Sequence, residues 1–201
     1  DQIIPARFLK ATERKGFGDN LFRDWRYNTD GSPKEDFVLN KSVYSGKILV
    51  GGRNFGSGSS REHAAWAVYD FGFRCVISSF FADIFKNNCL NVGVLPVQVS
   101  EDFLGEIFAA IEKDPTTEIL VDLEKQEVTL LSSGLKESFD INTYKKENML
   151  NGFDDIDYLQ NMKAEIVDFA AASIFRLKFG DDAGCSFHGF VGWTNRIRPT
   201  V

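Results

Sequence analysis

The middle of the chain alternates short apolar runs with stretches of helical periodicity, and this alternation constrains the fold more than any other feature. The apolar runs lie at residues 47–51, 73–78 and 93–99, and the helical patterns that follow them lie at 60–71, 80–87 and 102–113. Strands that alternate with helices predict an α/β layer with parallel strands and right-handed connections.

Beyond residue 113 the apolar pattern changes to a period of two. Residues 118–123 and 127–131 are expected to form a hairpin around the polar turn 124–126. Helices are expected at 139–150 and 155–172, separated by Asn151-Gly152. Because a hairpin brings antiparallel strands, we expect a mixed sheet within the α/β class.

The first 46 residues contain turn-forming glycine, asparagine, aspartate and proline throughout. We expect an irregular segment that is held to the core by its aromatic rings. These rings belong to Phe17, Phe22, Trp25, Tyr27 and Phe37. The same aromatics between residues 16 and 33 offer an alternative role, as the lining of a pocket.

Composition excludes several classes of protein. The 201 residues include 23 Lys and Arg against 29 Asp and Glu, and this net charge of −6 disfavours general nucleic-acid binding. No apolar run approaches the ~20 residues of a membrane span. The start resembles no secretory signal, and because it lacks Met we expect the natural N-terminus to lie upstream. A chain of this length favours one domain over two.

Cysteine and histidine usage argues against a metal site or a disulfide framework in this chain. There are three Cys, none in a C-x-x-C motif, and only two His. Thiols spaced in this way predict a reducing, cytoplasmic compartment. We interpret Cys89 as a packing residue because no His lies near it in sequence.

The candidate functional residues lie in the segment 51–66. Its sequence is G-G-R-N-F-G-S-G-S-S-R-E-H-A-A-W. A glycine loop that leads into a helix exposes backbone N–H groups at the positive end of the helix dipole. Ser59 and Ser60 add hydroxyls there, and Arg61 adds a guanidinium that grips carboxylates or phosphates. The segment therefore predicts an anion site.

A purely structural interpretation of this segment stays open. Ser59 and Glu62 have the spacing of a capping box, which would simply close the helix end. Nucleotide binding is disfavoured, because no Lys follows the glycines and Arg61 replaces the third glycine of a dinucleotide motif. We interpret His63 as a structural residue rather than a base.

Residues 54–66 resemble the small subunits of bacterial 3-isopropylmalate dehydratases, within the aconitase superfamily. The G-S-S-R-E-H core is typical of the superfamily, and the flanking blocks indicate the isopropylmalate branch. These blocks lie at 1–9, 16–25, 36–40, 79–88, 93–97, 122–128 and 151–156. The resemblance extends over residues 1–172, whereas the tail at 173–201 matches nothing in the family.

The resemblance implies an aconitase swivel-like β/β/α domain at residues 1–172. A separate large subunit would hold a 4Fe–4S cluster, and the substrate would lie between the subunits. The implied activity is a hydro-lyase that converts 2-isopropylmalate to 3-isopropylmalate in leucine biosynthesis and works only with the large subunit. The tail at 173–201 has no assigned role; it is either a native extension or foreign to the natural protein.

The same resemblance implies roles for individual residues. Ser59 matches the serine that removes the proton next to a carboxylate, and Ser60 and Arg61 match carboxylate binders. Arg14 matches a second anion-binding arginine in the opening segment. A serine is a poor base at neutral pH, so it needs N–H donors and a cation nearby, which a glycine loop at a helix start supplies.

Two alternatives remain at this stage. A related dehydratase for citraconate, citramalate or homoaconitate-type acids would use the same loop, because gripping a carboxylate is common to all of them. A non-catalytic subunit that senses a small dicarboxylate would also need the anion site. Turnover measured on a panel of these acids distinguishes the related dehydratase from an isopropylmalate enzyme. Dicarboxylate binding without turnover would identify the sensing subunit.

Overall fold

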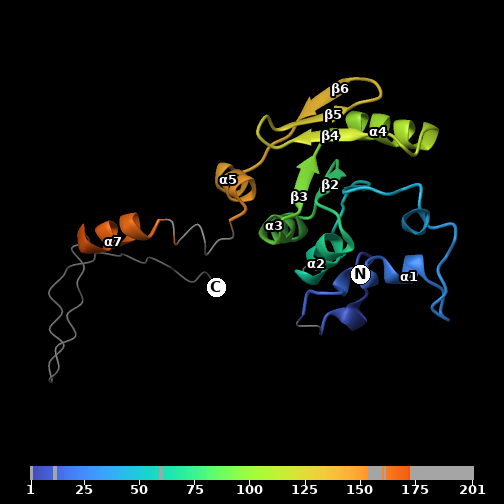
Figure 1. Ribbon diagram of the computed structural model, residues 1–201, viewed down its shortest axis with the longest axis horizontal. Coiled ribbons are helices and arrows are strands. Elements are labelled where there is room, and N and C mark those ends of the chain that lie inside the picture. The colour runs from blue at the N-terminus through green and yellow to red at the C-terminus, as the bar shows by residue number, and fades with distance from the viewer. Residues whose placement is uncertain (1, 11–12, 59–60, 154–159, 161, 173–201) are drawn as a thin grey trace, which may run out of the picture. The chain divides into compact units, whose positions relative to one another are not determined.

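The computed structural model describes residues 2–10, 13–58, 61–153, 160 and 162–172 (Figure 1). Contacts divide the chain into two units, Asp1–Asn161 and Met162–Val201. In the second unit, helix α7 covers Lys163–Ala172, which is the later part of the helix expected at 155–172. Residues 154–159, 161 and the tail 173–201 lie outside the described residues, so the domain boundary at 172 stays a prediction.

The opening segment contains only single turns of helix, as the sequence predicts. These are η1 (Ala6–Phe8), η2 (Phe17–Asn20), α1 (Arg23–Arg26) and η3 (Val38–Asn40). Phe17 and Phe22 are buried in the core, which fixes the segment. Arg7 hydrogen-bonds to Asp24, which joins η1 to α1 and holds the pKa of that carboxyl below its usual value.

The three apolar runs form a parallel sheet. Its strands are β1 (Ile48–Val50), β2 (Cys75–Ser78) and β3 (Leu95–Gln98), in the order β1-β2-β3. Helix α2 (His63–Phe71) connects the first two strands and α3 (Asp83–Val92) connects the last two. The predicted alternation of strands and helices is therefore confirmed.

Helix α3 begins later than the sequence pattern predicts. The expected start at residue 80 is wrong because the chain is still extended there: Phe81 forms a parallel bridge with Phe55. The N–H of Ala82 donates to the Phe55 carbonyl at 3.1 Å. The helix then continues to Val92 and ends at Gly93, which adopts a left-handed conformation.

The expected hairpin forms within a second sheet, which is antiparallel. Strands β4 (Ile119–Asp122) and β5 (Glu127–Leu130) pair as predicted. A third strand, β6 (Leu135–Ser138), pairs with β5 and was not predicted. Parallel and antiparallel strands are both present, but they lie in separate sheets rather than in one mixed sheet.

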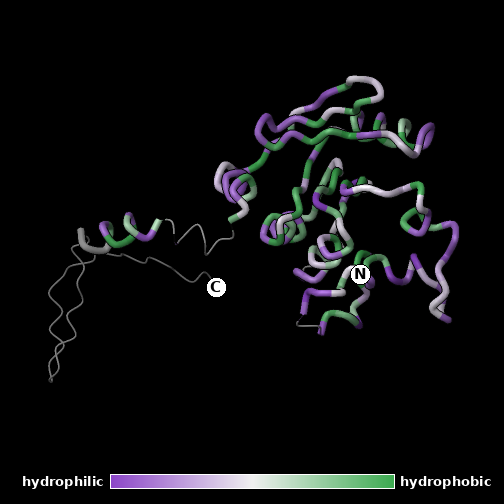
Figure 2. Tube along the Cα trace, viewed as in Figure 1, coloured by the Kyte–Doolittle hydropathy of each residue, from purple (hydrophilic) through white to green (hydrophobic). Residues whose placement is uncertain are grey.

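Helix α5 covers Thr143–Asn151, so the start predicted at residue 139 is wrong. Phe139 is buried, and its N–H donates to the Gln126 carbonyl at 2.9 Å, as an extension of β6. The Asn142 side chain then caps the helix by accepting from the Lys145 N–H at 3.3 Å. The helix is hydrophilic along most of its length (Figure 2).

Side chains of the parallel sheet alternate between two hydrophobic clusters. Val76 belongs to the cluster with α2, α3 and the opening segment. Cys75 and Ile77 belong to the cluster with α4 (Glu101–Lys113) and the antiparallel sheet. The unit is thus layered as helices, parallel sheet, and antiparallel sheet with α4, in agreement with the expected β/β/α arrangement. Every helix in the described ranges is too short or too polar to cross a membrane.

Replacing Gly18 by alanine is expected to destabilise the first unit by about 1–3 kcal/mol, the usual cost of overpacking. A Cβ at this position would lie 2.4 Å from the backbone nitrogen of Phe71, so η2 would have to move away from α2. Urea unfolding measures the change. Gly46→Ala is the matched control, because a Cβ there meets nothing within 4 Å; equal losses for both variants would contradict the prediction.

Candidate active site

The glycine loop begins at the carboxyl edge of the parallel sheet, where ligands of open α/β sheets commonly bind. Gly51 continues the ladder by donating its N–H to the Ile77 carbonyl at 2.9 Å. Gly56 has a φ of +85°, and a Cβ there would lie 2.3 Å from the ring of Phe85. Glycine is required at this point because the backbone rests directly on a buried ring of α3.

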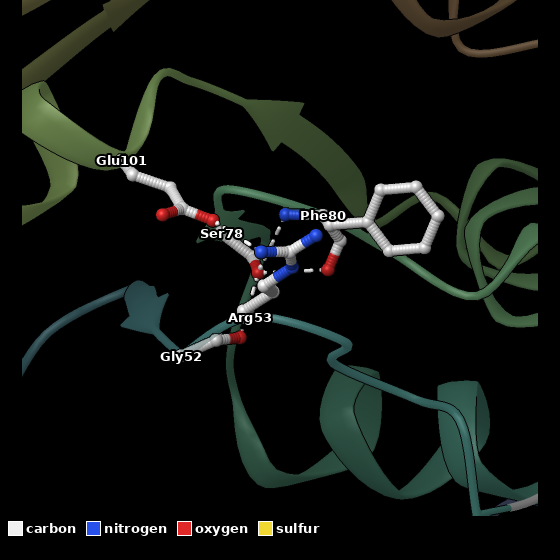
Figure 3. Close-up of polar contacts among 5 residues, drawn as sticks. All are labelled: Gly52, Arg53, Ser78, Phe80 and Glu101. Atoms are coloured by element: carbon white, nitrogen blue, oxygen red, sulfur yellow. Dashed lines mark hydrogen bonds and ion pairs between the residues drawn. The ribbon is translucent and has the colours of Figure 1, made fainter.

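The Ser78 hydroxyl fixes the start of the loop (Figure 3). Ser78 ends β2 and is completely buried. Its Oγ lies 2.8 Å from the Gly52 carbonyl and 3.0 Å from the Phe80 carbonyl, and it accepts from the Phe80 N–H at 3.3 Å. One hydroxyl thereby connects the turn after β1 to the turn after β2.

An exposed ion pair lies beside this junction. Arg53 Nη1 is 3.0 Å from Glu101 Oε1, in the first turn of α4 (Figure 3). Both side chains are largely exposed to solvent, so the pair contributes at most about 1 kcal/mol to stability. The pair marks the place where the start of the glycine loop lies next to the segment that follows β3.

Two of the predicted site residues, Ser59 and Ser60, lie outside the described residues. Their neighbours Gly58 and Arg61 are both exposed, and Arg61 lies two residues before the first residue of α2. The N-cap of α2 is Glu62, whose side chain makes no capping hydrogen bond. The capping-box interpretation depends on Ser59 and stays a prediction.

Arg14 reaches the first turn of α2 from 48 residues away in sequence. Its Nη2 donates to Glu62 Oε1 at 3.2 Å, and its Cζ lies 4.9 Å from the centroid of the Trp66 ring. Arg14 therefore lies next to the residue that follows Arg61. The structure brings these two predicted anion-binding residues to the same end of one helix.

Three rings support this end of α2. The rings of His63 and Trp66 lie 4.6 Å apart, and Phe17 packs edge-on to Trp66 at 6.2 Å. Phe17 also lies 5.6 Å from His63, so the imidazole is packed among aromatics. The sequence predicts only a capping role for Glu62 and no role for Trp66, although their i, i+4 spacing places them on one face of the helix.

The two described cysteines do not fit an iron–sulfur cluster. Cys75 and Cys89 are both buried, and burial raises the pKa of both thiols, that of Cys75 to about 12. Cluster ligands are thiolates, which such environments disfavour. Within the described ranges, no three His, Cys, Asp or Glu side chains are grouped so that they could hold a metal ion.

We expect Cys75 and Cys89 to resist alkylation by iodoacetamide at pH 8 in the native protein. Their raised pKa values keep both thiols protonated at that pH, and burial blocks access. Peptide mapping by mass spectrometry after native labelling measures the extent at each position. The urea-unfolded chain is the control and should be labelled at both; rapid native labelling of either would refute the expectation.

A cavity of about 450 Å³ lies beside the glycine loop. Phe22, Trp25 and Phe37 line it together with residues 51–58 of the loop. The rings of Phe22 and Trp25 are stacked at 5.7 Å. A larger hollow of about 890 Å³ lies between the end of α4 and the antiparallel sheet, but none of its lining residues belongs to the predicted site.

Comparisons with known proteins show the family and the fold. The family model described as "Aconitase C-terminal domain" matches residues 1–102, and the model described as LeuD_N matches residues 106–143. The 3-isopropylmalate dehydratase small subunit of Christiangramia forsetii is 60% identical over 169 residues, which cover 84% of this chain and 82% of the relative. The chain belongs to the 3-isopropylmalate dehydratase small-subunit family.

Further members support the assignment. The small subunit from Cytophaga hutchinsonii is 60% identical over 173 residues, which cover 86% of each chain. The crystal structure of 3-isopropylmalate dehydratase (leuD) from Methanocaldococcus jannaschii aligns with a TM-score of 0.60 and 27% identity, over 84% of this chain and 89% of that one. As a member of this family the chain is one subunit of a hydro-lyase, and its fold is that of the aconitase C-terminal domain.

Proposed function

We propose that this chain pairs with an iron–sulfur large subunit and supplies the base and the carboxylate-binding groups for the conversion of 2-isopropylmalate to 3-isopropylmalate. The observation that carries the proposal is the meeting of Arg14 with the first turn of α2, directly after Arg61. Two cations from distant segments at one helix start suit a substrate that has two carboxylates.

The reaction removes a proton next to a carboxylate, releases the hydroxyl group as water, and adds water back in the other orientation. In our proposal the Ser59 oxygen takes that proton. The charge that develops on the adjacent carboxylate is stabilised by Ser60, Arg61 and the N–H groups at the start of α2. Arg14 binds the second carboxylate and thereby orients the carbon that loses its proton.

The 4Fe–4S cluster belongs to the large subunit in this proposal. The buried, protonated state of Cys75 and Cys89 supports the assignment, since neither thiol suits a cluster. The chain then contributes the half of the site that grips carboxylates and moves the proton, and it has no hydratase activity alone. We place the enzyme in the cytoplasm, because free cysteines are typical of a reducing compartment.

We place the apolar branch of the substrate in the 450 Å³ cavity beside the loop. The rings of Phe22, Trp25 and Phe37 offer an apolar wall that matches an isopropyl group better than a third carboxylate. This contact favours isopropylmalate over the homoaconitate-type acids, which carry a charged group at that end of the molecule.

Reconstitution tests the function. The chain is co-expressed with the large subunit from the same genome, the cluster is assembled anaerobically, and dehydration is followed by absorbance of the alkene intermediate. We expect turnover of 2-isopropylmalate only when both chains are present. Turnover of citramalate or a homoaconitate-type acid instead would change the substrate, and dicarboxylate binding without any turnover would indicate a sensing subunit.

A further inference from the structure

We infer that Trp66 is a positioning residue: its indole face holds the Arg14 guanidinium at the start of α2, where Arg14 binds a substrate carboxylate. The inference rests on the proposed function and deepens it, because it names what orients the second cation. Its basis is the 4.9 Å separation between Arg14 Cζ and the Trp66 ring centroid, a distance typical of a cation–π contact.

Arg14 needs such a support. It belongs to an irregular segment, and 61% of its side chain is exposed. Its ion pair with Glu62, also partly exposed, is of the kind that orders a long side chain only weakly. A carboxylate partner also competes with the substrate for the same N–H donors, whereas a ring that faces the guanidinium occupies none of them.

Trp66 is itself rigidly held, so it makes a firm platform. Phe17, which is buried, packs edge-on against it at 6.2 Å, and the His63 ring lies 4.6 Å away. Its Nε1 is buried, and no hydrogen-bond partner for it is found in the structure. A buried N–H without a partner is unfavourable, so what tryptophan contributes here is its ring face rather than its polar atom.

The backbone near Arg14 is fixed to the same helix. The Phe17 N–H donates to the Arg14 carbonyl at 3.1 Å, and the Gly18 N–H donates to Asp70 Oδ2 in α2 at 2.8 Å. Arg14 and Trp66 therefore belong to one packed assembly of η2 and α2. We therefore expect this backbone to stay in place when the indole is removed, so that the main change is in the side chain of Arg14.

A double-mutant cycle in the reconstituted two-subunit enzyme tests the inference. We expect Trp66→Leu to raise KM for isopropylmalate about two- to fivefold, the size of an exposed cation–π contact, with a smaller change in kcat. Trp66→Phe should recover part of the loss because it keeps a ring. In an Arg14→Ala background, Trp66→Leu should raise KM no further.

The same helix provides a matched control. Arg74 lies over the ring of Tyr69 at 3.8 Å, near the other end of α2, so Tyr69→Leu removes a similar contact far from the loop. We expect it to leave KM unchanged. Thermal unfolding and co-purification with the large subunit monitor assembly, and Trp66→Met replaces Trp66→Leu if the latter fails to assemble.

The outcomes distinguish failure of the positioning role of Trp66 from failure of the proposed function. An active parent enzyme in which Trp66→Leu leaves KM unchanged, or raises it equally with and without Arg14, would overturn the positioning role. An Arg14→Ala enzyme with the parent KM would overturn it as well, together with the carboxylate role of Arg14. A parent enzyme that assembles with its cluster but turns over no malate-type acid would instead overturn the proposed function.

Discussion

Substitution of Ser59 by alanine is expected to lower kcat of the assembled enzyme by about two to four orders of magnitude, the usual contribution of a general base. KM should change little, because Ser60, Arg61 and Arg14 would still hold the carboxylates. Steady-state dehydration of 2-isopropylmalate measures both constants. Cluster content and co-purification with the large subunit establish that the variant assembles.

A serine far from the loop supplies the control for this change. Ser132 is exposed in the turn between β5 and β6, so Ser132→Ala makes the same chemical change at a position outside the candidate site. We expect it to retain full activity. A Ser59→Ala enzyme with normal kcat would remove Ser59 from the mechanism.

Substitution of Phe85 by alanine is expected to lower the free energy of unfolding by about 3–5 kcal/mol, as for other buried phenylalanines. Phe85 is completely buried, packs edge-on against Phe55 at 5.4 Å, and supports the backbone of Gly56. The cavity left behind would open beneath the glycine loop. We therefore expect loss of stability and loss of activity together, as measured by urea unfolding and by turnover with the large subunit.

The adjacent residue is the control for this prediction. Ile84 lies on the same helix but is 52% exposed, so Ile84→Ala should change stability by no more than about 0.5 kcal/mol. Similar losses for the two variants would mean that the packing of α3 against the loop contributes little to stability.

The parallel sheet and its helices could be predicted because the apolar runs are short, regular and separated by glycines. Two helix starts could not. Phe81 and Phe139 fit a helical pattern, yet both are buried in extended segments. Phe81 pairs with Phe55 in the glycine loop, and the Phe139 N–H donates to the Gln126 carbonyl. Tertiary pairing overrides local periodicity in such places.

The third antiparallel strand was missed for a different reason. β6 is exposed at three of its four residues, so it lacks the alternation of a half-buried strand. Its one local signal is Gly134, which has a φ of +73° and donates its N–H to the Leu130 carbonyl at 2.8 Å. A turn of this kind directly after a strand indicates that another strand follows.

The site was predicted in part. The glycine loop and the serine–arginine motif are local in sequence, so they could be found there, and the resemblance added Arg14. The contacts that place Arg14 could not be predicted, because they join residues 48 positions apart. The role of the Ser78 hydroxyl could not be predicted either, because a serine at the end of a strand forms no distinctive sequence pattern.

The hydrogen bonds of Ser78 have a mechanical consequence. Its hydroxyl connects the turns that follow β1 and β2, and the loop beyond rests on the ring of Phe85. The start of the loop therefore cannot swing as an independent flap. If the site opens to admit substrate, this wall should move as a rigid body together with the sheet, and the hinge must lie outside residues 51–56.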